Sequence, residues 1–318
     1  MIAALIIIAS LFLLIFIVCG VVAGYLYNLI ICPSSDKSII LLAPHNKKNS
    51  FLSKENDQNI PYKMPFKNNS QSVYIKSYDG LKLHVYALKN HALSNSWVIM
   101  CHGYSGNALR LKRAAALFYK MGLNVLAPDA RGHGKSEGKY IGMGWHERLD
   151  VISWVNLIIS KNKDAKIVLY GVSMGGATVA MASGENLPKN IKCIIEDCGY
   201  TSVWSELNYQ FRKFLKSKFK LTSNLILNLI SLETKIRAKY SFKEADALKQ
   251  VKKSKTPMLF IHGSKDKFVP TFMADKLYDA ATCKKEKLII EGAAHAESYE
   301  FSPGLYEKAV KNFIEENL

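Results

Sequence analysis

The sequence predicts an α/β fold, with a mainly parallel central sheet, helices on both faces, a small helical insertion and an N-terminal transmembrane helix. From residue 97 onward, short apolar runs alternate with longer amphipathic stretches, which is typical of strands and helices that build a parallel sheet. Residues 2–31 carry no charge and are almost wholly apolar. The chain has 318 residues, 49% hydrophobic and 11% aromatic, enough for a sizeable buried core.

The N-terminal apolar run is longer than the roughly 20 residues that a helix needs to cross a bilayer. A cleaved signal peptide would begin with a basic segment, which is missing here, and would have a shorter apolar core. We therefore interpret residues 1–32 as an uncleaved transmembrane anchor. Lys37, Lys47, Lys48 and Lys54 follow it and favour a cytoplasmic location of the folded domain, but interleaved acidic residues leave the opposite orientation open.

Residues 33–71 are rich in Ser, Asn, Lys and Pro and show little periodicity, so we interpret them as a juxtamembrane stalk. The folded domain is predicted to span residues 72–318. It begins with two strands, VYIKSY and LKLHVYAL, joined by a hairpin at Asp79-Gly80. Asp-Gly supplies the positive φ angles that a tight hairpin turn needs.

The alternating pattern supplies the rest of the fold, since each short apolar run is a candidate strand and each longer amphipathic stretch a candidate helix. The predicted strands are residues 97–102, 124–129, 166–171, 191–197, 258–263 and 287–290. The predicted helices lie near 107–121, 144–160 and 271–281, with one from 174 and a closing one from about 303.

Residues from about 200 to 250 interrupt this alternation, because they contain no strand-like run. We interpret them as an inserted helical cap. Apolar residues alternate there with the basic side chains of Arg212, Lys213, Lys216, Lys218 and Lys220. Such a cap could cover a substrate pocket or rest on a membrane surface. An ordinary amphipathic packing helix is the alternative.

The most specific motif is GVSMG at residues 171–175, between a predicted strand and a predicted helix. In Gly-x-Ser-x-Gly at such a turn, the serine is held in a strained conformation with its hydroxyl projecting from the backbone. The glycines leave the room that so tight a turn requires. Ser173 is therefore the candidate nucleophile.

A serine hydroxyl becomes a strong nucleophile when a base removes its proton and a third group orients that base. Asp266 follows the predicted strand 258–263, and His295 follows the predicted strand 287–290. Both therefore lie at carboxyl ends of strands, where parallel sheets build their sites. We predict Ser173, His295 and Asp266 as nucleophile, base and orienting acid.

Two alternatives stay open at this point. His133 lies in the glycine-rich segment DARGHGKSEG and could be the base, although it precedes the serine and its loop could instead shape the pocket. Glu196 or Asp197, at the end of a predicted strand, could replace Asp266 as the acid.

An oxyanion that forms during acyl transfer needs preorganised backbone N–H donors. The residue after the nucleophile supplies one, which here is Met174. We predict the N–H of Tyr104 as the second donor, because HGYSGN at residues 102–107 follows an earlier strand.

The motifs HGYSGN, DARGHGKSEG, GVSMGG, HGSKDKFVP and GAAHAES, in this order, resemble those of the α/β-hydrolase family. The apolar N-terminus, EDCGY and HAESY are similar, more narrowly, to membrane-anchored bacterial hydrolases of the Firmicutes. The resemblance covers about residues 72–316 and implies an α/β-hydrolase fold, a serine nucleophile and a location at the bacterial cell membrane. It leaves the substrate open, because the family cleaves esters, lipids, thioesters and peptides.

The leading hypothesis is a serine hydrolase that cleaves carboxylic esters, with a small-molecule or lipid acyl ester as substrate, since the chain carries a membrane anchor and an apolar, basic cap. The expected acyl-enzyme mechanism needs no cofactor and no metal. A serine peptidase, thioesterase or acyltransferase is an alternative on the same fold. A non-catalytic membrane receptor or scaffold is an alternative of a different class.

The net charge of +17 fits attraction to anionic lipid headgroups. The sequence contains no zinc-finger spacing, RNA-recognition signature or dense basic block, so we expect no nucleic-acid partner. The six cysteines are scattered and are predicted to be free thiols. The sequence makes no prediction about the oligomeric state.

Overall fold

The computed structural model describes residues 2–33, 70–90, 95–214 and 220–318. Most of the predicted stalk lies outside these residues, as do Lys216 and Lys218 of the predicted basic cap. All six cysteines are free, as predicted, and Cys101, Cys193 and Cys198 are buried.

Within the described residues, eight strands form one sheet in the order β1-β2-β4-β3-β5-β6-β7-β8. The strands are β1 (Gln71–Lys76), β2 (Lys82–Leu88), β3 (Ser96–Cys101), β4 (Asn124–Pro128), β5 (Lys166–Val172), β6 (Ile191–Asp197), β7 (Met258–Gly263) and β8 (Lys285–Ile290). From β4 to β8 every neighbouring pair is parallel, whereas β1 and β2 are antiparallel additions at one edge. The predicted hairpin joins them, but through the longer loop of residues 77–81; Gly80 has the predicted positive φ, 93°, whereas Asp79 is not among the residues with positive φ.

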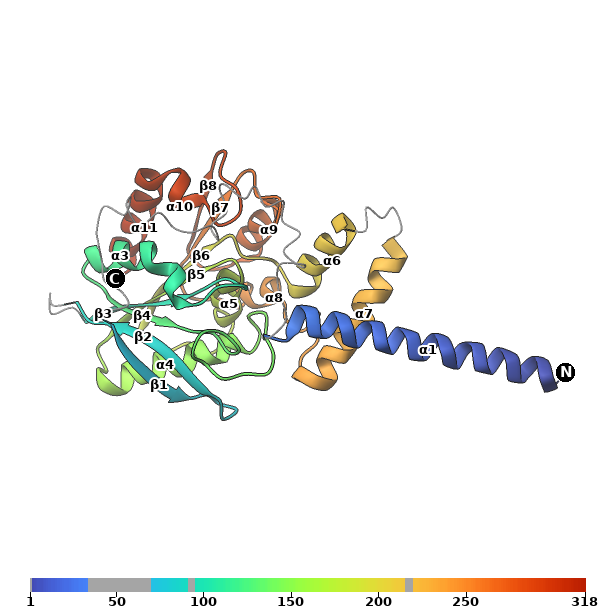
Figure 1. Cartoon of the computed structure of the whole chain (residues 1–318). Coiled ribbons are helices and arrows are strands. Elements are labelled where there is room, and N and C mark those ends of the chain that lie inside the picture. The colour runs from blue at the N-terminus through green and yellow to red at the C-terminus, as the bar shows by residue number, and fades with distance from the viewer. Residues whose placement is uncertain (1, 34–69, 91–94, 215–219) are drawn as a thin grey trace.

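Helices cover both faces of the sheet, as predicted (Figure 1). The helices of the main body are α3 (Lys112–Lys120) after the short 3₁₀ turn η2 (Ala108–Leu111), α4 (Glu147–Lys161), α5 (Met174–Ala182), α8 (Ala247–Val251), α9 (Phe272–Ala280), α10 (Ser298–Phe301) and α11 (Pro303–Asn317). Successive side chains of β5 point to opposite faces, so that Leu169 packs with Trp154 of α4 and Tyr170 packs with Phe118 of α3. The central strands are thus packed between apolar side chains on both faces of the sheet. This packing fixes the positions of the loops at their carboxyl ends.

The predicted cap consists of α6 (Val203–Phe214) and α7 (Lys220–Ala238). α8 also falls within residues 200–250, but it packs on α5 in the main body, so the projecting part of the insertion ends with α7. The side chains of Arg212 and Lys213 are exposed, and Lys213 Nζ donates to the carbonyl of Lys267 at 3.0 Å.

The N-terminal helix α1 (Ile2–Ile31) projects away from the sheet, next to α7 (Figure 1). It is long and apolar enough to cross a membrane, with a mean hydropathy of 3.3 over its most apolar window, a property that signal sequences share. Its C-terminal end packs against α7, where Tyr27 is buried under the guanidinium of Arg237, 4.1 Å from the ring centroid. The sequence did not predict this contact between α1 and the cap.

Candidate active site

Ser173 lies at the turn between β5 and α5, with φ of 58° and ψ of −118°. This strained conformation requires both glycines of the motif. A Cβ on Gly171 would lie 2.1 Å from the carbonyl oxygen of Gly175, and a Cβ on Gly175 would lie 2.0 Å from that of Cys101. The backbone N–H of Ser173 donates to the carbonyl of Asp197 at 2.8 Å, which ties the turn to the end of β6.

The structure brings the three predicted residues together in one chain of hydrogen bonds. Ser173 Oγ lies 2.9 Å from His295 Nε2, and His295 Nδ1 lies 2.6 Å from Asp266 Oδ2. Ser173 is 9% exposed. The residues come from the loops after β5, β7 and β8, so the parallel order of these strands gathers side chains that are distant in sequence.

Asp266 is held in its charged form by its neighbours. Burial alone would raise its pKa, but His295 and His262 lower it to about 2. The backbone N–H groups of Phe268 and Val269 donate to Asp266 Oδ1 at 2.8 and 2.9 Å. The carboxylate is therefore both fixed in position and ionised.

His262, at the end of β7, is a second histidine on this carboxylate that the sequence motifs did not reveal. Its Nε2 lies 3.2 Å from Asp266 Oδ2 and donates to the carbonyl of Val269 at 2.8 Å. The only available sequence signal is its position four residues before Asp266 in HGSKD.

The alternative residues have other partners. Both ring nitrogens of His133 face carbonyl oxygens, those of Arg131 at 3.0 Å and Tyr104 at 2.6 Å. Asp197 Oδ2 accepts from the hydroxyl of Tyr306 at 2.8 Å, and burial raises the pKa of Asp197 to about 6.

Glu196 accepts a hydrogen bond from the N–H of Gly199. In the part of the chain that the structure describes, His133 does not contact Ser173, and neither Glu196 nor Asp197 hydrogen-bonds His295.

Tyr104 and Met174, the predicted oxyanion donors, line the same cavity as Ser173. Met174 is the first residue of α5, where helix N–H groups point out of the helix without an intrahelical partner. The loop after β3 passes close by, since a Cβ on Gly103 would lie 3.5 Å from Ser173 Cβ. His133 and the hydroxyl of Tyr104 fix this loop, the hydroxyl by donating to the carbonyl of Ile30.

The cavity in front of Ser173 has a volume of about 140 Å³ and a mostly apolar lining. Its walls come from α1, the cap and the loops above the sheet. The lining residues are Leu26, Leu29, Ile30, Tyr104, Met143, Ser173, Met174, Tyr200, Glu206, Leu207, Gln210, Phe211, Phe214 and Phe268.

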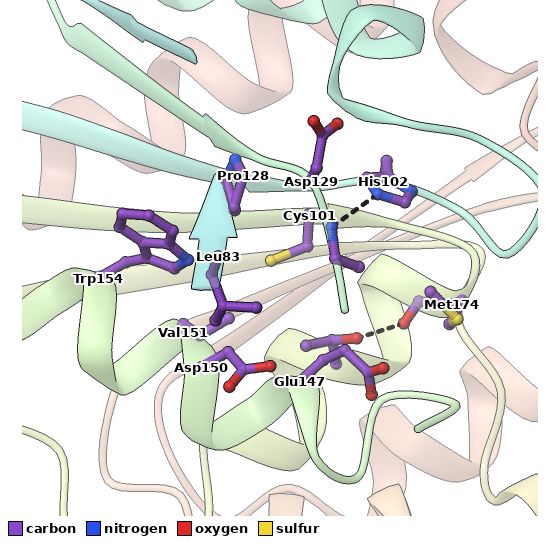
Figure 2. A pocket seen from close by; sticks show the side chains of 12 residues that line it. Leu83, Cys101, His102, Pro128, Asp129, Glu147, Asp150, Val151, Trp154 and Met174 are labelled. Carbon is purple, nitrogen blue, oxygen red and sulfur yellow. Dashed lines mark hydrogen bonds between the residues drawn. The ribbon is translucent and has the colours of Figure 1, made fainter. Parts of the chain in front are cut away.

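A second cavity lies behind Met174 and has a volume of about 20 Å³, enough for one water molecule. Figure 2 shows it between Leu83 and Trp154 on one side and His102 and Met174 on the other. It is too small for a substrate. A wider groove of about 780 Å³ lies between α3 and α11, and its lining residues include none of the three linked side chains.

Cys198, Asp266 and His295 carry potential metal-binding atoms within 4.8 Å of one another. Two of these residues, His295 and Asp266, are already joined by the 2.6 Å hydrogen bond between Nδ1 and Oδ2. Burial raises the pKa of Cys198 well above its usual value, so its sulfur stays a neutral thiol, which is a weak ligand. This donor set fits a hydrogen-bonded triad better than a metal site.

Known proteins are similar to this chain in sequence and in structure. A family model described as serine aminopeptidase, S33, matches residues 94–249. The uncharacterized protein YqkD of Bacillus subtilis is 29% identical over 297 residues, which cover 93% of this chain and 92% of that one. The uncharacterized membrane protein YNL320W of Saccharomyces cerevisiae is 27% identical over 211 residues, covering 66% and 67%.

Among solved structures, the esterase Pf2001 of Pyrococcus furiosus superposes with a TM-score of 0.63 and 23% identity, over 79% of this chain and 94% of that one. At this identity the likeness shows a shared fold. The fold class predicted from the sequence is confirmed.

Proposed function

We propose that this chain is a serine hydrolase of the α/β-hydrolase superfamily that cleaves carboxylic esters, with Ser173 as nucleophile, His295 as general base and Asp266 as the orienting acid; the matched family model and the shared fold support this proposal. One observation carries the proposal. The 2.9 Å contact from Ser173 Oγ to His295 Nε2 and the 2.6 Å contact from His295 Nδ1 to Asp266 Oδ2 form one continuous path at the wall of an apolar cavity.

The proposed reaction has two acyl-transfer steps. Ser173 Oγ attacks the ester carbonyl carbon while its proton passes to His295 Nε2, and ionised Asp266 stabilises the resulting imidazolium. The N–H groups of Met174 and Tyr104 bind the oxyanion. His295 then gives the proton to the departing alcohol as the C–O bond breaks, and a water molecule repeats the sequence to release the acid from Ser173.

The lining of the cavity supports an ester with an apolar acyl group. Leu207, Phe211 and Phe268 contribute hydrocarbon and aromatic surface close to the serine. Burying such an acyl group contributes roughly 0.8 kcal/mol for each CH₂ removed from water. The esterase with the same fold is consistent with this chemistry.

We also propose that α1 anchors the protein in a membrane. Its 30 uncharged, mostly apolar residues and the relative described as a membrane protein support this placement. A cleaved signal sequence is the competing reading, and the mass of the mature N-terminal peptide separates the two. An anchored chain keeps residues 2–31 and stays in the membrane fraction after alkaline washing, whereas a processed chain begins beyond them.

Labelling with a fluorophosphonate probe tests the nucleophile. The full chain in detergent micelles should react, and Ser173→Ala should not, because the probe forms its covalent bond with an activated serine oxygen. Ser183→Ala is the matched control, since Ser183 is a buried serine of the same region whose hydroxyl donates to the carbonyl of Ala180 at 2.8 Å. Labelling that survives in Ser173→Ala contradicts the assignment.

Turnover of p-nitrophenyl esters, an acyl thioester and an aminoacyl p-nitroanilide tests the reaction class. We expect the esters to be cleaved fastest. Cleavage of the anilide without ester turnover would instead identify a peptidase, in line with the description of the matched family model. A protein that binds these compounds but neither labels nor turns over would be a non-catalytic receptor or scaffold.

A further inference from the structure

The end of α1 is fixed directly to the folded domain. The carbonyl of Ile31 accepts a hydrogen bond from the N–H of Ile141 at 2.8 Å, and the hydroxyl of Tyr104 donates to the carbonyl of Ile30. Ile30 and Ile31 are 2% and 0% exposed. This end of the helix is therefore part of the domain rather than a loose tether.

α1 is longer than a membrane crossing requires. It has 30 residues, whereas roughly 20 span the hydrocarbon core. Its most apolar 18-residue window is 0% buried, and the buried side chains begin at Ala23 and continue at Tyr27. The helix thus divides into an N-terminal part that is free to contact lipid and a C-terminal part of about two and a half turns, residues 23–31, that packs on the domain.

The C-terminal part of α1 forms one wall of the cavity in front of Ser173. Leu26, Leu29 and Ile30 all line this cavity. Their spacing of three and four residues places them on one face of the helix. Phe211 of the cap is among the lining residues contributed by α6. An acyl chain in the cavity would therefore contact the anchor itself.

The rim of the cavity continues into an exposed apolar surface. Phe214 lines the cavity and is 59% exposed, which locates an opening at the end of α6. On α7, next to α1, Leu225, Leu232 and Ile236 are 58%, 59% and 58% exposed and share one helix face. α1, α6 and α7 extend from the sheet on the same side (Figure 1). Exposed apolar surface of this kind typically marks a membrane or partner contact.

We propose that residues 23–31 of α1 are a wall of an acyl-chain site, and that the substrate is a membrane lipid ester whose acyl chain passes from the bilayer along α1 to Ser173. This inference rests on the proposed serine-hydrolase function and adds the source of the substrate and the residues that select its chain. A chain that follows this route stays in apolar surroundings throughout. Passage through water would cost about 0.8 kcal/mol for each exposed CH₂.

The selectivity for acyl length tests the wall. In full-length protein, Leu29→Trp fills the cavity and should lower the ratio of kcat/KM for p-nitrophenyl laurate to that for p-nitrophenyl acetate by about tenfold or more. Leu14→Trp makes the same change on the 57% exposed part of α1 and should leave the ratio at the parent value. An equal ratio in the two variants overturns the proposed wall.

A second variant covers a failure of Leu29→Trp to fold, which circular dichroism would reveal. Leu29→Ala enlarges the same site and should change the laurate-to-acetate ratio in the opposite direction, or admit bulkier acyl groups. An unchanged acyl preference in a folded Leu29→Ala protein contradicts the inference. If the parent protein neither labels nor cleaves either ester, the proposed function itself fails, which is a distinguishable result.

The route through the bilayer has its own test. Full-length protein is reconstituted in phosphatidylcholine vesicles that contain dioleoylglycerol, an ester that exchanges slowly between vesicles. In the second arrangement the protein is in plain phosphatidylcholine vesicles, which are mixed with separate vesicles that hold the dioleoylglycerol. Hydrolysis should be faster when protein and ester share a bilayer, at equal total concentrations. Equal initial rates in the two arrangements would mean that the ester arrives through water, and the proposed route would be wrong.

Discussion

Two buried carboxyl groups near Ser173 have very different pKa values. The backbone N–H groups of Phe268 and Val269 donate to Asp266, and His295 and His262 lower its pKa to about 2 against the effect of burial. Glu206 in the cavity wall is 4% exposed, and burial raises its pKa to about 8, against a smaller opposing effect of its hydrogen bond from Gln210. Environments that separate the pKa values of neighbouring acids in this way are typical of functional sites. Near neutral pH, Asp266 is therefore charged. Glu206 keeps its proton and adds no charge to the wall of the cavity in front of Ser173.

The raised pKa of Glu206 predicts a pH-dependent gain in stability for Glu206→Gln. Between pH 4.5 and about 8, the unfolded parent has released this proton while the folded parent still holds it, so the folded parent loses stability as the pH rises. Glutamine keeps an oxygen that can accept the 2.7 Å hydrogen bond from Gln210 and has no proton to lose.

The free energy of unfolding of Glu206→Gln, measured relative to the parent by urea denaturation, should therefore rise across this interval by up to about 1.4 kcal/mol per pH unit and level off above it. The other buried acids are common to both proteins and cancel in the difference. A difference that stays constant with pH would show that Glu206 is ionised in the folded protein.

At the level of elements, the turn between β5 and α5 depends on close backbone contacts. Gly175→Ala would bring its Cβ to 2.0 Å from the carbonyl oxygen of Cys101, so β3 and α5 would have to separate. We expect a loss of stability of about 3 kcal/mol and slower fluorophosphonate labelling, because the shift moves Ser173 and the N–H of Met174.

Gly304→Ala is the matched control for this prediction. A Cβ on Gly304 in α11 meets nothing within 4 Å, so this variant should be stabilised by up to about 1 kcal/mol. Denaturant unfolding and labelling rates measure both variants. Equal stabilities would mean that the turn does not need a glycine at position 175.

The pattern of elements was predictable because each strand and helix has its own local periodicity. The buried runs WVIMC and KIVLYG indicate central strands without reference to the rest of the chain. The order of the strands in the sheet could not be predicted in the same way, because local periodicity carries no information on which strands pair. β2, for example, lies beside β4 rather than β3. The same holds for α8, which lies within the predicted cap but packs on α5.

For the whole molecule, the sequence predicted a site from the positions of Ser173, Asp266 and His295 at strand ends, and the structure brings these three side chains within hydrogen-bonding distance. The sequence could not reveal His262 or the contact of Ile30 with Tyr104, because both depend on distances between segments that no motif links. In the sequence, α1 therefore looked like a separate unit, whereas in the structure its last turns help to build the cavity in front of Ser173.

Trapping of the acyl-enzyme directly tests whether Ser173 is the nucleophile. The full-length protein is mixed with p-nitrophenyl laurate, quenched in acid within the first turnovers and digested for mass spectrometry. We expect a lauroyl group on Ser173 that is absent in Ser173→Ala and decays when the ester is exhausted. Ester consumption without any adduct on Ser173, or an adduct on another residue that turns over at the same rate, would contradict the role of Ser173 as nucleophile.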